Sequence, residues 1–178
     1  IVFSGVIFYS CKPTYKTINK VNKTIEYNSK EEYCVKIKDK YNLETSNLVF
    51  IDSVQKNNFM NYIVNEKVAY IYGIVVNAEE KIDNNFIQEN NSCYSRVTNL
   101  IKSNPELIGE KIIPTKILNL NYYNSKNESI KLEGNKIIVF VFSTKLGTSI
   151  INDIKKITDE FKTNESFKSY NYYLISID

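Results

Sequence analysis

Apolar residues recur along this chain with two different periods, which predict alternating strands and helices. Residues Ile137–Phe142 are apolar at every position, as expected of a central strand that is buried on both faces. Residues Tyr172–Ile177 predict a final strand. Between these strands, four apolar residues have the 4-3-4 spacing of an amphipathic helix: Ile150, Ile154, Ile157 and Phe161. Strand, helix and strand in this order predict a parallel βαβ unit at the C-terminal end.

The first half of the chain carries further start signals and apolar runs. Ser29 and Glu32 form a capping box, which predicts that a helix begins there. The apolar face of this helix would hold Cys34, Ile37 and Tyr41. The run Leu48–Ile51 predicts a short buried strand, and Asp52–Gln55 predicts the start of a second helix with an apolar stripe at Phe59, Met60, Ile63 and Val64.

The middle of the chain is richer in strand signals. Residues 68–76 favour a strand and are followed by a turn at 77–81. Ser92 predicts the start of a helix that carries Val97, Leu100 and Ile101, and residues 117–132 predict a hairpin around a polar turn at 124–128. The pattern as a whole predicts one α/β domain over residues 29–178, with a mixed sheet and a C-terminal βαβ unit.

Composition removes several classes of function. The 178-residue chain contains no histidine, which excludes Ser-His-Asp and Cys-His catalysis and histidine-ligated metals. Three cysteines cannot form a four-cysteine zinc site. The net charge is only +3 and Arg96 is the single arginine, so recognition of nucleic acid is not expected. We therefore assign no catalytic residue, metal site or cofactor from the sequence.

The N-terminal segment has the pattern of an export signal. Residues Ile1–Ser10 are mostly apolar, and Cys11 follows the small residue Ser10. This stretch resembles the lipoprotein signals of Bacteroidetes-type bacteria, which implies lipidation at Cys11, a cell-envelope location and a membrane partner reached through the lipid. Residues 11–28 would then be a tether. The alternative is an N-terminal β-strand, because Val, Ile, Phe and Tyr favour strands.

The C-terminal βαβ pattern also resembles a known fold family. Residues 136–149, the helix after them and the strand that ends at Asp178 resemble the opening βαβ unit of a thioredoxin-like domain. Residues 68–81 are similar to the later hairpin of that family. The order of the segments implies a permuted variant. Residues 144–149 hold no cysteine and no proline precedes Val68, so the resemblance extends to the fold and not to redox activity.

Two cysteines remain if Cys11 carries lipid. Cys34 lies on the apolar side of its expected helix, whereas Cys93 lies in the first turn of another helix, where the helix dipole lowers a thiol pKa. Three readings stay open: a disulfide between Cys34 and Cys93, two unreactive thiols, or a reactive thiol.

The turn between the expected strand Ile137–Phe142 and the helix that follows it is the candidate ligand loop. Thr144, Gly147, Thr148 and Ser149 lie where a central strand passes into a helix, and free backbone N–H groups there suit anions. Thr148 is equally explained as a helix N-cap. Carboxylates are scattered, and three of them, Asp153, Asp159 and Glu160, fall on the expected solvated side of the last helix.

Fourteen tyrosines suggest a stacking or carbohydrate-binding face. Six of them fall in expected strands, where aromatic residues are common in any case: Tyr70, Tyr72, Tyr122, Tyr123, Tyr172 and Tyr173.

These observations lead to an expected function. The chain is interpreted as a non-catalytic, lipid-anchored envelope protein whose α/β domain binds a protein or a small ligand. The first alternative is a thiol or redox protein that uses Cys93 or Cys34. The second is a carboxylate hydrolase, which would require two facing acids in one cleft.

Overall fold

One mixed β-sheet organises the part of the chain that the computed structural model describes, namely residues 24–65, 74–77, 81–82, 111–112, 119–134, 136–168 and 170–178. The strand order within these residues is β4-β3-β2-β7-β8-β1-β5-β6. The strands are β1 Leu48–Ile51, β2 Ile74–Asn77, β3 Lys81–Ile82, β4 Lys111–Ile112, β5 Tyr122–Tyr123, β6 Ser129–Ile130, β7 Lys136–Phe142 and β8 Asn171–Ser176. The helices are α2 Lys30–Tyr41, α3 Ser53–Asn65 and α5 Thr148–Thr163, with short 3-10 turns η2 Thr144–Leu146 and η3 Glu165–Phe167. The predicted α/β class is confirmed.

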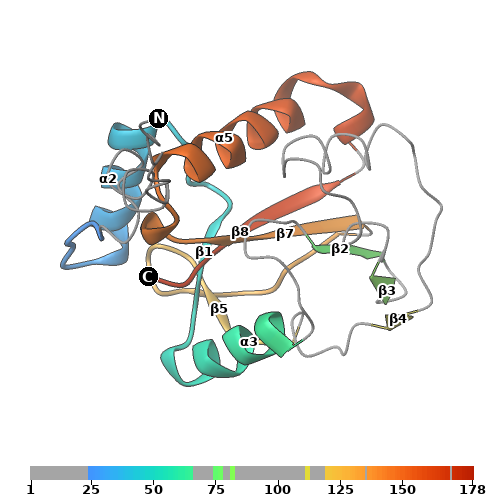
Figure 1. Cartoon of the computed structure of the whole chain (residues 1–178), viewed down its shortest axis with the longest axis horizontal. Coiled ribbons are helices and arrows are strands. Elements are labelled where there is room, and N and C mark those ends of the chain that lie inside the picture. The colour runs from blue at the N-terminus through green and yellow to red at the C-terminus, as the bar shows by residue number, and fades with distance from the viewer. Residues whose placement is uncertain are drawn as a thin grey trace, which may run out of the picture.

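Strand β7 lies inside the sheet, as its apolar sequence predicts. It pairs with β8 in parallel and with β2 antiparallel. Helix α5 connects β7 to β8, so the predicted C-terminal βαβ unit is present (Figure 1). Strand β1 lies on the other side of β8 and is also parallel to it. Three parallel strands, β7, β8 and β1, therefore form the centre of the sheet.

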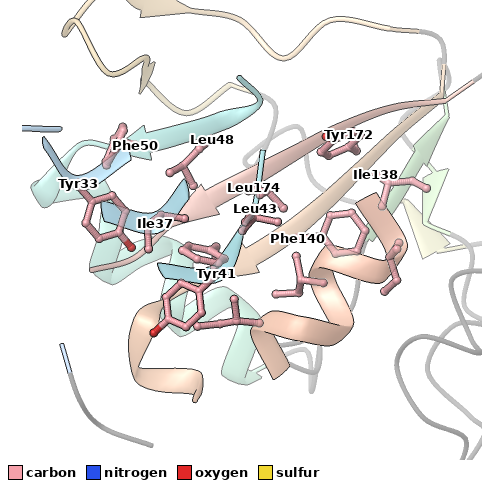
Figure 2. Close-up of a cluster of buried hydrophobic side chains, with 14 of the residues drawn as sticks. Tyr33, Ile37, Tyr41, Leu43, Leu48, Phe50, Ile138, Phe140, Tyr172 and Leu174 are labelled. Atoms are coloured by element: carbon pink, nitrogen blue, oxygen red, sulfur yellow. The ribbon is translucent and has the colours of Figure 1, made fainter. Parts of the chain in front are cut away.

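The two faces of the sheet are covered by different helices. Helices α2 and α5 lie over one face and α3 lies over the other (Figure 1). Strand residues alternate between the faces: Phe140 and Leu174 point toward α2 and α5, whereas Val139 and Ile175 pack on the side of α3. Figure 2 shows the first of these clusters, in which Phe140 and Tyr172 of the central strands gather with residues of α2 such as Tyr33 and Ile37.

Helix α2 begins at its predicted cap, with one difference in detail. The Ser29 side chain accepts a hydrogen bond from the Glu32 N–H at 3.1 Å. Glu32, however, reaches back to the N–H of Asn28 at 2.8 Å, one residue before the cap. The buried face of α2 consists of Tyr33, Ile37 and Tyr41, and the predicted Cys34 is only half-buried beside it.

Helix α5 confirms the predicted amphipathic pattern but shifts its centre by one position. Its fully buried apolar residues are Ile151, Ile154 and Ile157, while Ile150 is half-buried. The opposite side is solvated as expected, because Lys155 pairs with Asp159 and Lys156 pairs with Asp153.

The other expected elements are confirmed in part. Strand β1 has the bounds predicted for it, and all four of its residues are buried. Helix α3 follows it, and the Asp52 carboxylate accepts a hydrogen bond from the Val54 N–H at 2.7 Å. Strands β5 and β6 form the predicted hairpin, although each has only two residues. The signal segment, the cysteines Cys11 and Cys93, the tyrosines Tyr70 and Tyr72 and the helix expected after Ser92 lie outside the described residues.

The last residues of the predicted tether pack against the domain. Ile25 packs against the apolar cluster beneath α2, and the Tyr27 and Tyr33 rings lie 4.7 Å apart. The Lys36 ammonium donates to the backbone oxygen of Glu26 at 2.7 Å. Residues 24–28 therefore lie against α2 as part of the domain. No helix among the described residues is long and apolar enough to cross a membrane.

Candidate functional site

The predicted ligand loop lies at the carboxyl ends of the three central parallel strands. Strand β7 ends at Phe142, directly before Ser143 and Thr144, and β8 ends two residues before Asp178. Helices α5 and α3 both begin at this edge, so their N-terminal ends point toward it (Figure 1). This is the edge where parallel α/β sheets usually bind ligands.

The Asp178 carboxylate joins the segment after β8 to two other segments, namely the loop after β7 and helix α2. Ser143 donates its hydroxyl hydrogen to Oδ1 of Asp178. Thr144 donates to Oδ2 from its N–H and from its hydroxyl, each at 2.8 Å. The Tyr33 hydroxyl on α2 donates to the same oxygen at 2.5 Å. We call this arrangement the Asp178 clamp; the sequence did not reveal it.

Tyr33 is fully buried within the Asp178 clamp. Burial raises the pKa of its hydroxyl far above the ordinary value, and the negative charge of Asp178 raises it further. The Ser176 hydroxyl lies beside Tyr33 and offsets part of this shift, although it makes no hydrogen bond of normal geometry within the described residues. Tyr33 therefore stays protonated and serves as a permanent hydrogen-bond donor to Asp178.

The loop residues divide into two groups. Thr144 is buried, and both of its donors are taken by Asp178. The interpretation of Thr148 as an N-cap is wrong, because α5 begins at Thr148 and Gly147, with φ 91°, takes the cap position without a side-chain hydrogen bond. Thr148 and Ser149 occupy the first turn of α5 and are half-buried. The protein's own carboxylate thus occupies the Thr144 part of the predicted anion loop.

Two lysines from different elements face this edge. Burial lowers the pKa of Lys56 on α3, and the positive charge of Lys145 in η2 lowers it further, while Asp178 opposes the shift. Neither lysine belongs to an ion pair within the described residues. Binding of an anion at Thr148 and Ser149 stays a prediction.

Two acids lie at this edge of the sheet, and each accepts hydrogen bonds from the protein itself. Asp178 is engaged by hydroxyl and backbone donors, and Asp52 caps α3. Within the described residues, no group of three or more cysteine, aspartate or glutamate side chains gathers to hold a metal ion.

Cys34 lies on the half-buried flank of α2 and forms no disulfide with another described residue. Burial raises its pKa above the ordinary value, and the charge of Glu31 adds to this shift. A nucleophilic cysteine requires the opposite, a lowered pKa. Because Cys93 lies outside the described residues, a bridge between the two cysteines stays a prediction.

This environment predicts a slow reaction of Cys34 with alkylating reagents. In a variant that carries Cys11→Ser and Cys93→Ser, we expect iodoacetamide at pH 7.5 to modify Cys34 several-fold more slowly than it modifies glutathione. The rate should rise with pH over a more alkaline range than that of glutathione, because burial raises the pKa of the Cys34 thiol and delays formation of the thiolate. Mass spectrometry of timed samples measures this rate. A reaction faster than that of glutathione at pH 7.5 would contradict the structure.

The predicted tyrosine face is not one surface. Tyr172 packs beneath α5, whereas its neighbour Tyr173 packs on the side of α3. The same alternation separates Tyr122, which is fully buried, from Tyr123. Neighbouring residues of a strand point to opposite faces, so adjacent tyrosines do not lie together on one face of the sheet.

A hollow of about 460 Å³ instead gathers aromatic residues at the opposite end of the sheet, where β8 begins and α5 ends. Its volume lies in the range of small-ligand sites. We call it the aromatic hollow. It is lined by Asn47, Phe161, Phe167, Lys168, Tyr170, Asn171, Tyr172 and Tyr173.

The rings of the aromatic hollow support one another. Phe161 is half-buried, and its ring lies 5.0 Å from that of Phe167 in an edge-to-face arrangement and 4.6 Å from that of Tyr172. Phe167 is fully buried and Tyr172 is 7% exposed. The partly exposed Phe161 ring is therefore held in place by two rings that belong to the core.

Polar groups at the rim are fixed by the backbone. The Asn171 carboxamide donates to the Glu133 oxygen at 2.7 Å, and the Tyr173 hydroxyl accepts from the Glu133 N–H at 2.9 Å. Gly134, with φ 140°, makes this contact feasible, because a Cβ atom there would lie 2.6 Å from the Asn171 amide nitrogen.

The comparisons with known proteins identify no relative. No family model matches the chain, and neither curated proteins nor solved structures show significant similarity to it. The fold and the two ends of the sheet thus define this chain only as an α/β domain. It has a structural clamp at one end of the sheet and an aromatic hollow at the other.

Proposed function

We propose that this chain is a lipid-anchored protein of the bacterial cell envelope whose α/β domain binds a ligand and catalyses no reaction. The observation that carries the binding part of this proposal is the aromatic hollow, whose lining combines packed aromatic rings with polar side chains. The anchoring part rests on the apolar pattern of Ile1–Ser10 directly before Cys11. The Asp178 clamp supports it, because the carboxylate at the usual ligand edge is engaged in holding the fold together. The resemblance to a thioredoxin-like domain stays a prediction about the fold.

The binding part of this proposal can be tested with a fragment library. Fragments added to the ¹⁵N-labelled chain should shift backbone signals at the aromatic hollow, with the largest changes near Phe161 and Asn171. The first turn of α5, at Thr148 and Ser149, provides an internal comparison. Shifts centred on Thr148 and Ser149 would place the ligand at the opposite edge and contradict the proposed site.

The anchoring part requires a separate experiment. Expression of the complete gene in a bacterial host should place the protein in the membrane fraction with the added mass of a diacylglycerol group on Cys11. One acyl chain binds membranes only weakly, so more than one chain is expected on this residue. The Cys11→Ala variant is the control and should lose both the added mass and the membrane association. An unmodified wild-type product that does not sediment with membranes would refute the anchor.

A further inference from the structure

The aromatic hollow has features that select one chemical class of ligand. Its lining includes Phe161, which is half-buried and whose ring packs against two core rings. Asn47 and Asn171 also line it, and each has a carboxamide side chain. Aromatic faces pack well against flat C–H surfaces, and carboxamides both donate and accept hydrogen bonds. A ligand that fits both groups has apolar faces and hydroxyl edges.

The charges around the aromatic hollow balance one another. Glu44 and Asp159 lie close enough to Tyr172 to raise its pKa, after the larger effect of burial. Both carboxylates pair with Lys162 at 4.0 Å, and Asp159 pairs with Lys155 as well. Lys168, the one charged residue in the lining, pairs with Glu165 at 2.5 Å. Three lysines thus face three carboxylates, which favours an uncharged ligand.

One polar side chain of the lining, Asn171, is held in place by a hydrogen bond to the backbone. The Asn171 nitrogen is bound to the Glu133 backbone oxygen, which fixes the plane of the carboxamide. Asn47 lies close enough to Tyr172 to oppose the pKa shift of this tyrosine. Fixed side chains lose little conformational entropy when a ligand binds.

We infer that the aromatic hollow binds a neutral oligosaccharide, with a sugar ring packed on Phe161 and its hydroxyls bonded to the carboxamides at the rim. This inference rests on the proposed binding function and specifies its ligand. It needs no cofactor and no change in covalent bonds.

The test is calorimetric titration of the full chain with four hexasaccharides: cellohexaose, maltohexaose, the hexamer of N-acetylglucosamine and the hexamer of galacturonic acid. At least one neutral hexamer should bind with a Kd below about 1 mM. The Phe161→Leu variant keeps an apolar side chain but removes the flat ring, and should weaken binding about tenfold.

Two controls make the titration specific. Tyr27→Leu removes another partly exposed ring that lies against a core ring, but at the Asp178 end of the sheet, and should leave binding unchanged. Lys156→Ala removes an exposed lysine of α5 that is not part of the lining, and it should also leave the binding of neutral sugars unchanged. Circular dichroism checks that each variant folds. If Phe161→Leu fails this check, Asn171→Ala replaces it, because Asn171 is exposed.

Three results would overturn the inference. The first is that no neutral hexamer binds. The second is equal binding by the wild type and by the folded rim or ring variant. The third is a preference for the galacturonate hexamer that disappears in Lys168→Ala. Fragment shifts at the aromatic hollow without sugar binding would refute the saccharide class and leave the proposed binding function standing.

Discussion

Replacing Phe140 by alanine is expected to lower the free energy of unfolding by about 3–5 kcal/mol. Phe140 is fully buried on the central strand β7, beneath α5, and its ring lies 6.5 Å from that of Tyr172 in an edge-to-face arrangement. Strands pair with β7 on both sides, so the surrounding residues have little freedom to close the cavity that alanine would leave. Urea unfolding followed by circular dichroism measures the loss.

The effect of Phe140→Ala should be large compared with the stability of the whole domain. Domains of this size are usually stable by only about 5–15 kcal/mol. If the alanine variant does not fold, Phe140→Leu leaves a smaller cavity, so it should lose less stability than Phe140→Ala and remain measurable. Val35→Ala on α2, where Val35 is 57% exposed, is the control and should change stability by less than about 0.5 kcal/mol. A loss below about 1 kcal/mol in Phe140→Ala would show that β7 is not the centre of the core.

The second large effect is expected at the Asp178 clamp. Asp178→Ala removes the acceptor of four hydrogen bonds and leaves the buried Tyr33 and Thr144 hydroxyls without their partner. An unsatisfied buried group costs about 1–3 kcal/mol, so the variant should lose about 2–4 kcal/mol in the same urea experiment. Asp178→Asn keeps the shape but points an amide toward hydrogen-bond donors, and should lose nearly as much.

A surface acid gives the matched control for Asp178. Asp153 on α5 also carries one carboxylate, but its partner Lys156 lies 3.5 Å away and is largely exposed. Exposed ion pairs contribute about 0–1 kcal/mol, so Asp153→Ala should be nearly neutral. Equal losses in Asp153→Ala and Asp178→Ala would mean that the clamp does not hold α2 and the start of α5 onto the sheet.

The elements that were predictable from the sequence are those whose pattern is local. Ile137–Phe142 is apolar on both faces, and this property alone indicates a central strand. Ser29 reveals the start of α2 through residues only three positions apart. The buried face of α5 could be located only to within one residue, because Ile150 and Ile151 are equally apolar and packing decides between them.

The candidate sites depend on contacts between distant segments, and this limits what the sequence reveals about them. Tyr33 and Asp178 are 145 residues apart, and only the parallel pairing of β1 with β8 places α2 beside the end of β8. The aromatic hollow likewise combines the residue before β1 with the end of α5 and the start of β8. The tyrosines of the strands suggested a face for sugar binding, but Tyr172 and Tyr173 of β8 pack on opposite faces of the sheet, and the hollow that we propose as the site lies at the end of the strand.

The packing of residues 24–28 on α2 limits how far the domain can stand from a bilayer. In a chain held by lipid at Cys11, twelve residues would separate this cysteine from Thr24 and act as the tether. Fully extended, this stretch spans at most about 45 Å, and as a random coil it would average only about 20 Å. These lengths are comparable to the thickness of a bilayer. Such a short tether would confine the domain to a thin layer above the membrane, where it would meet surface-bound ligands far more often than dissolved ones.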